Sequence, residues 1–207
     1  MFVSLDGVDG VGKSTQIALL VDWLQQRGYE LLVCRDPGGT ELGEQLRELL
    51  LTQRGLSIGI RAEMLMYMAA RAQLVEERIR PALQAGKIVI SDRFLLANVV
   101  YQGYGAGLDV EHVWQVGQIA TAGILPTLTI LLDLPAATAL ARLGSRRDRM
   151  EARGVEYLER VRNGFLVEAA RQSNVVVIDA AEKVDVIQEQ IRAAVERQLS
   201  TERVVTR

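Results

Sequence analysis

The sequence predicts an α/β fold in which a five-stranded parallel sheet lies between two layers of helices. Short apolar runs that end in Gly, Asp or Pro alternate with longer segments of helical periodicity, which is typical of parallel strands joined by crossover helices. The chain has 207 residues, of which 49% are hydrophobic, so it can bury the core of one sizeable domain. We therefore expect a single domain over residues 1–207, with a frayed tail from 201 to 207.

The predicted strands are five runs that are nearly continuous in apolar residues. Strands buried on both faces of a parallel sheet have this composition, because helices cover each side. The runs cover residues 2–6, 30–34, 87–91, 127–132 and 174–178.

The predicted helices are the periodic segments between and after these strands. Several of them end at a helix-stopping residue, such as Gly28, Gly86 or Pro126. The segments cover residues 14–27, 41–51, 62–85, 110–122, 136–143, 155–171 and 184–199.

Charge and cysteine content exclude several classes of protein. Lys and Arg total 24 against 26 for Asp and Glu, so the net charge of −2 offers no global attraction to nucleic acid or anionic lipid. Cys34 is the only cysteine, which rules out an intramolecular disulfide, and we expect it to be a buried strand thiol. The first residues show no export signal, and together these features favour a cytoplasmic location.

The strongest motif follows the first predicted strand and reads G-V-D-G-V-G-K-S-T, which matches G-x-x-x-x-G-K-[ST]. Glycines let successive backbone N–H groups surround phosphate oxygens, and the helix that follows adds its positive N-terminal end. The match predicts a P-loop in which Lys13 bridges the β- and γ-phosphates and the Ser14 hydroxyl binds Mg²⁺. The predicted ATP-binding loop comprises Gly7, Val8, Asp9, Gly10, Val11, Gly12, Lys13, Ser14 and Thr15.

Charged residues also follow the second and third strands. Arg35 and Asp36 come at the end of the second strand, and Asp92 and Arg93 come at the end of the third. Ligands of open α/β sheets bind at this carboxyl edge. Arg35 and Arg93 are therefore candidates for a second phosphate group, and Asp92 is a candidate to hold magnesium through water.

The ordered set of motifs resembles the bacterial thymidylate kinase family of P-loop nucleoside monophosphate kinases. The P-loop is followed, with similar spacing, by R-D-P-G-G-T, A-A-R-A-Q, S-D-R-F and Y-Q-G. The resemblance covers essentially the whole chain. It implies ATP-dependent phosphorylation of dTMP to dTDP in dTTP synthesis, Mg²⁺ as the cofactor, a mobile lid and a homodimer.

The resemblance also assigns roles to individual residues. Asp9 corresponds to an acidic residue near the sugar and phosphate of the acceptor, and Arg35 and Arg93 correspond to arginines that bind its phosphate. Tyr67 and Arg71 lie four residues apart on one face of the long helix, where a ring can stack on a pyrimidine and a guanidinium can donate to its carbonyl oxygen. The family usually has Phe at the Tyr67 position.

Three further residues are expected to read the acceptor. By resemblance Asn98 faces the base edge, with Gln102 beside it, and Tyr101 stands where a ribose 2′-hydroxyl would fall. The amide of Asn98 offers both a donor and an acceptor to thymine. The predicted acceptor-binding residues are Asp9, Arg35, Pro37, Tyr67, Arg71, Arg93, Asn98, Tyr101 and Gln102.

An arginine-rich connection over residues 142–153 is the predicted lid. It contains Arg142, Arg146 and Arg147, and a cation that closes over the transferring phosphoryl group stabilises its developing charge. Gly10 occupies the position where some members of the family carry a catalytic arginine, so the charge must come from elsewhere. The predicted catalytic residues are Lys13, Asp9, Arg93, Arg146 and Arg147, and Arg142 is expected at ATP.

Two alternatives remain open. One is a kinase for another small nucleotide or deoxynucleoside. Tyr67, Arg71 and Asn98 are the residues that distinguish it from a dTMP kinase. The other is a GTP-binding switch, which requires N-K-x-D; the nearest match, at residues 182–185, has Glu in place of Asn. His112 receives no role, and Asp133 ranks below Asp92 as a magnesium partner because Leu134 and Pro135 follow it directly.

Overall fold

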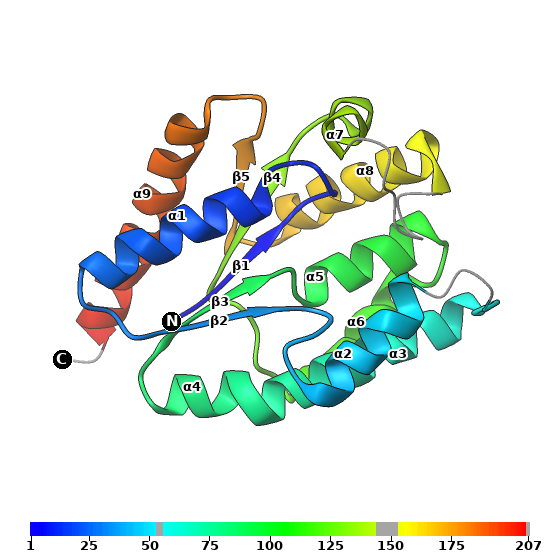
Figure 1. Cartoon of the computed structure of the whole chain (residues 1–207), viewed down its shortest axis with the longest axis horizontal. Helices are drawn as coiled ribbons and strands as arrows, with labels where there is room; N and C mark the ends of the chain where they lie inside the picture. The colour runs from blue at the N-terminus through cyan, green and yellow to red at the C-terminus, as the bar shows by residue number, and fades with distance from the viewer. Residues whose placement is uncertain (53–55, 144–152, 206–207) are drawn as a thin grey trace.

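The computed structural model describes residues 1–52, 56–143 and 153–205, and its centre is a five-stranded parallel sheet of order β2-β3-β1-β4-β5 (Figure 1). The predicted α/β class is thus confirmed. The strands are β1 (Phe2–Asp6), β2 (Leu31–Arg35), β3 (Ile88–Asp92), β4 (Leu128–Asp133) and β5 (Val175–Asp179).

The four strands after β1 each begin and end one residue later than predicted. The reason is that backbone pairing continues past the last apolar residue: Arg35 pairs with Asp92, and Asp133 pairs with Asp179. Side-chain polarity therefore marks the strand end one residue too early. The last residues of β2, β3, β4 and β5 are therefore one arginine and three aspartates: Arg35, Asp92, Asp133 and Asp179.

The expectation that every strand is buried on both faces is wrong for the two edges. Val33 in β2 and Val177 in β5 are each 46% exposed, and Cys34 is only partly buried. An apolar run does not show whether its strand lies at the edge or in the middle of the sheet, because the order of the strands is set by the tertiary structure.

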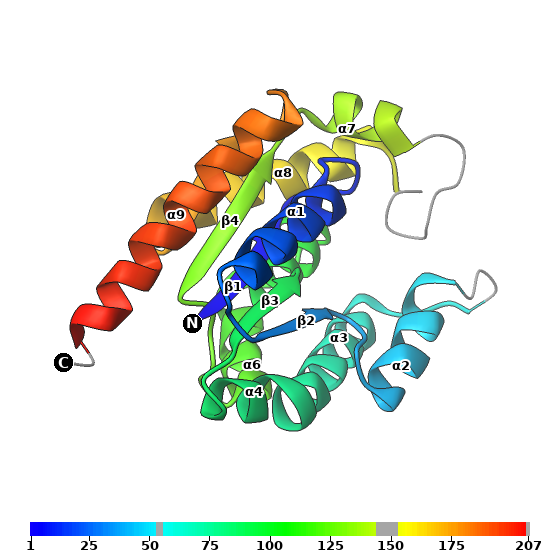
Figure 2. The ribbon, with the colours of Figure 1, turned by 60° about the vertical axis from the view of Figure 1, so that its left-hand side comes forward.

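Helices cover both faces of the sheet. α1 and α9 pack side by side over one face, whereas α8 lies over the opposite face (Figure 2). The main helices are α1 (Lys13–Gln26), α2 (Glu41–Leu51), α3 (Ile60–Leu74), α6 (Val110–Thr121), α7 (Ala136–Leu143), α8 (Val155–Arg171) and α9 (Val184–Val205).

Three helical segments differ from the prediction. The helix expected over 62–85 is interrupted by a π-helical stretch, η1 (Val75–Ile79), before α4 (Arg80–Gln84). A short α5 (Leu95–Asn98) and a second π-helix, η2 (Val99–Gly105), follow β3 and were not predicted. A π-turn holds an extra residue, so regular 3.6-residue periodicity does not reveal it.

The expected frayed tail is instead mostly helical. α9 continues to Val205, because no Gly or Pro stops it. Within the described parts of the chain, no helix has the length and hydropathy needed to cross a bilayer.

Candidate active site

The P-loop joins β1 to α1 through a run of backbone conformations that favour glycine. Gly7, Gly10 and Gly12 have φ values of 132°, 87° and 98°, and a Cβ at Gly7 would lie 2.4 Å from the carbonyl oxygen of Leu132. Only glycine avoids both the strain and the contact. The loop therefore has the tight backbone that a phosphate-binding turn requires.

Side chains of the loop divide into buried and accessible groups. Val8 and Val11 are buried in the core, so only their backbone atoms are available to a ligand. Ser14 and Thr15 are exposed at the start of α1. Their hydroxyls lie at the helix N-terminus, where the helix dipole and free N–H groups attract anions.

Lys13 is held over the loop rather than extended into solvent. Its Nζ donates to the carbonyl oxygens of Gly7 and Val8 at 3.1 and 3.0 Å and lies 3.6 Å from Asp9 Oδ1. Burial and the nearby Arg93 lower the pKa of Lys13. A cation in this position is poised to exchange carbonyl oxygens for phosphate oxygens.

Arg93 connects the P-loop to the residues beside it. It follows β3 with a φ of 67°, a left-handed conformation that is uncommon for a bulky residue and concentrates at functional sites. Its guanidinium donates to Gly7 O at 2.7 Å, to Asp9 Oδ1 at 2.6 Å and to the Tyr101 hydroxyl at 3.3 Å. Burial alone would raise the pKa of Asp9, but Arg93 and Lys13 hold it well below its usual range.

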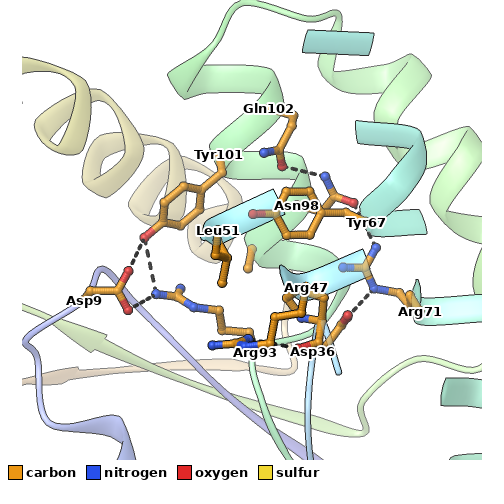
Figure 3. Close-up of a pocket in the computed structure, with 12 residues that line it drawn as sticks. Asp9, Asp36, Arg47, Leu51, Tyr67, Arg71, Arg93, Asn98, Tyr101 and Gln102 are labelled. Atoms are coloured by element: carbon orange, nitrogen blue, oxygen red, sulfur yellow. Dashed lines mark hydrogen bonds and ion pairs between the residues drawn. The ribbon is translucent and has the colours of Figure 1, made fainter. Parts of the chain in front are cut away.

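A pocket with about 530 Å³ of empty space opens next to Arg93, and we call it the side pocket (Figure 3). It combines apolar walls with convergent polar groups, as small-molecule sites do. Every predicted acceptor residue except Arg35 lines it. The lining residues are Asp9, Asp36, Pro37, Arg47, Leu51, Tyr67, Arg71, Arg93, Ala97, Asn98, Tyr101 and Gln102.

Arg35 does not line the side pocket. Its side chain is 53% exposed and donates to Glu44 at 2.6 Å, and Glu44 also accepts from the backbone N–H of Gly39. Arg35 therefore braces the loop that carries Pro37. The guanidinium that lines the pocket from this part of the chain belongs to Arg47 on α2, which donates to Pro37 O at 2.9 Å.

Sequence reasoning missed Arg47, Leu51 and Ala97 as pocket residues. Arg47 and Leu51 lie on α2, in a segment whose only local signal is helical periodicity. Their approach to the pocket depends on how α2 packs against α3, which no motif records. Asp36 was noted at the strand end but received no role.

A buried chain of polar groups forms the inner wall of the side pocket. Arg71 Nε donates to Asp36 Oδ2 at 2.5 Å, and Arg71 Nη1 donates to Asn98 Oδ1 at 2.9 Å. Burial raises the pKa of Asp36, which the neighbouring Arg71 opposes. Asn98 then donates to Gln102, and Gln102 donates to Glu63. These contacts leave few rotational choices for Arg71, Asn98 and Gln102.

The carboxylates at the sheet edge fit a role near a hard cation. Oδ1 of Asp92 is shielded from solvent and has no hydrogen-bond partner among the described residues, and the same holds for Oδ1 of Asp6. An orphaned buried carboxylate oxygen is a suitable partner for Mg²⁺ or its bound water. Asp133 instead forms a bidentate ion pair with Arg162 at 2.8 and 2.9 Å.

The remaining candidates that fall in the described residues lie outside this centre. Arg142 donates to Ala180 O at 3.2 Å after β5, whereas Arg146 and Arg147 lie outside the described residues. His112 is exposed beside Asp109, and the described residues contain no cluster of three or more potential metal ligands. Asp185 lies in the first turn of α9, as expected if residues 182–185 are a helix start and not a guanine-reading motif.

Comparisons with known proteins agree with this geometry. A family model described as thymidylate kinase matches residues 5–191. The chain is 46% identical over 192 residues to a thymidylate kinase of Rhodopirellula baltica, covering 92% of this chain and 78% of that protein. It is 42% identical over 205 residues to a thymidylate kinase of Caldanaerobacter subterraneus, with 98% of each covered.

A solved structure is also similar over nearly the whole chain. The crystal structure of thymidylate kinase from Ehrlichia chaffeensis superposes with a TM-score of 0.78 at 30% identity, covering 95% of this chain and 98% of that one. The likeness therefore extends from the motifs to the arrangement of the sheet and helices.

Proposed function

Because the chain belongs to the thymidylate kinase family, we propose that its P-loop and side pocket act together to transfer the γ-phosphate of ATP directly onto dTMP. The enzyme phosphorylates dTMP to dTDP. The observation that carries the proposed arrangement is Arg93, which contacts Gly7 of the P-loop and, through Asp9 and Tyr101, the side pocket.

ATP is the proposed ligand of the P-loop. The backbone of residues 7–15 surrounds the β- and γ-phosphates, and Lys13 donates to their oxygens in place of the carbonyls of Gly7 and Val8. Ser14 and Asp92 are the residues that would hold Mg²⁺, which neutralises charge on the phosphates when it is bound. Arg142 near Ala180 is a candidate contact at the nucleoside end.

The phosphate of dTMP is proposed to lie at the P-loop end of the side pocket. Arg93 and Arg47 present guanidinium groups there, and arginine forks match phosphate oxygens. Asp9 keeps Arg93 oriented, because its Oδ1 accepts a hydrogen bond from Arg93 Nη2 at 2.6 Å. Donor and acceptor phosphates then meet at Arg93, so transfer proceeds in line without a covalent enzyme intermediate.

The thymine base is proposed to lie at the far end of the side pocket. Tyr67 supplies an aromatic ring there, and Arg71 and Asn98 supply a donor and an acceptor. Tyr101 lies beside Arg93 and Asp9 with its ring 5.1 Å from the Arg93 guanidinium. Its bulk supports a preference for deoxynucleotides over ribonucleotides.

Three further proposals rest on the family and on exposed residues. Arg146 and Arg147 are proposed to stabilise the transferring phosphoryl group from a lid over residues 142–153. A homodimer is supported by exposed Leu65 on α3 and exposed Ile119 on α6, two helices that pack against each other. We also propose a cytoplasmic location, which suits an ATP-dependent step of nucleotide synthesis.

An acceptor panel tests this function. The purified protein is incubated with ATP and Mg²⁺ and, in turn, dTMP, dUMP, dCMP, dGMP, UMP or a deoxynucleoside, and ADP release is measured. We expect the highest kcat/KM for dTMP and a value roughly 10- to 200-fold lower for dUMP, because one methyl contact is worth roughly 1–3 kcal/mol. A higher kcat/KM for another acceptor, or binding of GTP in preference to ATP without transfer, would contradict the proposal.

A further inference from the structure

Glu63 is a buried carboxylate that lies behind the side pocket without lining it. It is 1% exposed on α3, and its two oxygens accept from different residues. Oε1 accepts from Gln102 Nε2 at 3.0 Å, and Oε2 accepts from Arg153 Nη2 at 2.8 Å. A buried carboxylate requires such partners, so Glu63 is fixed from both sides.

The hydrogen bonds that run from Glu63 have a direction. An ionised carboxylate only accepts, so the amide nitrogen of Gln102 must face Glu63 and its Oε1 must face away. That oxygen accepts from Asn98 Nδ2 at 2.5 Å. Asn98 Oδ1 is then turned toward Arg71, whose Nη1 donates to it at 2.9 Å.

We propose that Glu63 is a positioning residue that sets the amide orientation of Gln102 and, together with the Arg71 donor, that of Asn98, and through them the preference for thymine over cytosine. The inference rests on the proposed function of the side pocket. Glu63 does not need to touch the nucleotide, because its effect is transmitted through two amides that do line the pocket.

The chemistry of the two bases makes this orientation decisive. Thymine presents an N3–H donor and a carbonyl oxygen, whereas cytosine presents an N3 acceptor and an amino group. Asn98 Oδ1 has a second lone pair beside the Arg71 donor, and this pair of groups matches thymine. A flipped Asn98 would present its NH₂ group to the base and would suit the N3 acceptor of cytosine.

Replacement of Glu63 by Gln keeps a side chain of the same size but removes the acceptor-only group that fixes the direction of the hydrogen bonds. In Glu63→Gln either end of residue 63 can face Gln102, so the amide of Gln102 loses its fixed orientation and Asn98 is oriented by the Arg71 donor alone. We expect the ratio of kcat/KM for dTMP to that for dCMP to fall at least tenfold. The change should come chiefly from a higher KM for dTMP, with the KM for ATP within about twofold of wild type.

A matched control is Glu168→Gln. Glu168 is also a buried carboxylate, 3% exposed, and it accepts from the Tyr104 hydroxyl and Trp114 Nε1 at 2.7 and 3.1 Å. It contributes nothing to the side pocket, so its variant should keep the dTMP to dCMP ratio within about twofold. If Glu63→Gln lowered kcat/KM for both acceptors equally, Glu63 would be a structural residue and the inference would be wrong.

The exchanged variant Glu63→Gln with Gln102→Glu provides the second test. A carboxylate at position 102 only accepts, so Asn98 must again turn its NH₂ toward it, as in the wild type. We expect this double variant to recover the dTMP to dCMP ratio to within about threefold. It decides the question even if the single variant does not fold, because a folded double variant with a low ratio contradicts the inference.

The experiments distinguish a failure of the proposed function from a failure of the role assigned to Glu63. Wild-type protein that does not phosphorylate dTMP would overturn the proposed function. Wild-type protein that prefers dTMP, combined with a Glu63→Gln variant that keeps the same preference, would overturn only the role of Glu63.

Discussion

Four charged side chains meet where β1 ends, and their surroundings set the charge of each. Burial raises the pKa of Asp6 to about 6, although Arg93 and Lys13 oppose the shift. Asp9 is more exposed and contacts Arg93 directly, so its pKa stays well below the usual range. The centre therefore has one carboxylate that stays ionised and one that titrates near neutrality.

The raised pKa of Asp6 predicts a pH-dependent stability. The folded state binds the Asp6 proton more tightly than the unfolded state, so the free energy of unfolding falls as the pH rises from about 4 to 6. Asp6→Asn has no carboxyl group to ionise at this position, so it should not lose this part of the free energy of unfolding. The shift of about two units corresponds to roughly 3 kcal/mol, so the variant should have a Tm several degrees above wild type at pH 8.

Thermal unfolding at pH 8 and pH 4 checks this prediction. The advantage of Asp6→Asn should be absent at pH 4, where the wild-type carboxyl is protonated. Asp22→Asn, at an exposed position, serves as the control and should change Tm little at either pH. An equal Tm difference for Asp6→Asn at both pH values would mean that titration is not the cause.

Substitution of two arginines near the side pocket should change the KM for dTMP to different extents. Arg47→Ala should raise the KM for dTMP about tenfold to a hundredfold, because hydrogen bonds to a charged group contribute roughly 1.5–3 kcal/mol. Arg35→Ala should change it less than about threefold, since Arg35 pairs with Glu44 at the surface. Steady-state kinetics with varied dTMP compares them, and a larger effect of Arg35→Ala would place the acceptor phosphate elsewhere.

At the level of secondary-structure elements, local signals predicted the sheet and the P-loop but not the parts that depend on packing. The strands and the loop could be predicted because apolar runs and glycine spacing are properties of the sequence itself. The exposed edges β2 and β5 and the π-helix η2 depend on neighbours. The side pocket shows the same division, since Tyr67 and Asn98 belong to motifs whereas Arg47 reaches the pocket only through the packing of α2.

η2 shows why an irregular element is useful at this site. It carries both Tyr101 and Gln102 to the side pocket directly after Asn98 at the end of α5. A π-turn shifts the register of the following side chains by about one residue relative to an α-helix. The Tyr157 hydroxyl also donates to Tyr101 O at 3.0 Å, which anchors this segment to α8.

The contact between the P-loop and α7 predicts the cost of a side chain at Gly10. A Cβ there would lie 2.2 Å from the carbonyl oxygen of Ala139, and Gly10 has a φ of 87°. Gly10→Ala should therefore lower the free energy of unfolding by about 2–5 kcal/mol, from backbone strain of about 1–2 and overpacking of about 1–3. The same contact leaves no room for a side chain at Gly10 unless the loop or α7 shifts.

Gly28→Ala is the matched control for this prediction. Gly28 has a similar φ of 80°, and apart from its chain neighbours no atom of the described residues would lie within 4 Å of a Cβ at this position, so its variant should lose only about 1–2 kcal/mol. Urea titrations of both variants measure the difference. Equal losses would show that the contact with α7 adds nothing.

For the whole molecule, the strand order explains how distant motifs form one site. β1 lies between β3 and β4, and Leu5 pairs with Asp92, so the P-loop after β1 emerges beside Arg93 after β3. β2 is the next strand outward and brings Asp36 and Pro37 to the same edge. The topology thus places the P-loop and the side pocket at neighbouring strand ends, where ligands of open α/β sheets bind.

Direct transfer from ATP to dTMP is tested most directly by ³¹P NMR of the reaction with wild-type enzyme and with Lys13→Ala. We expect the wild type to form ADP and dTDP in equal amounts with no orthophosphate. Lys13→Ala should remain folded but form neither product, because the cation that meets the γ-phosphate is gone. Orthophosphate in place of dTDP, phosphate bound to the protein, or wild-type turnover by Lys13→Ala would contradict direct transfer at this site.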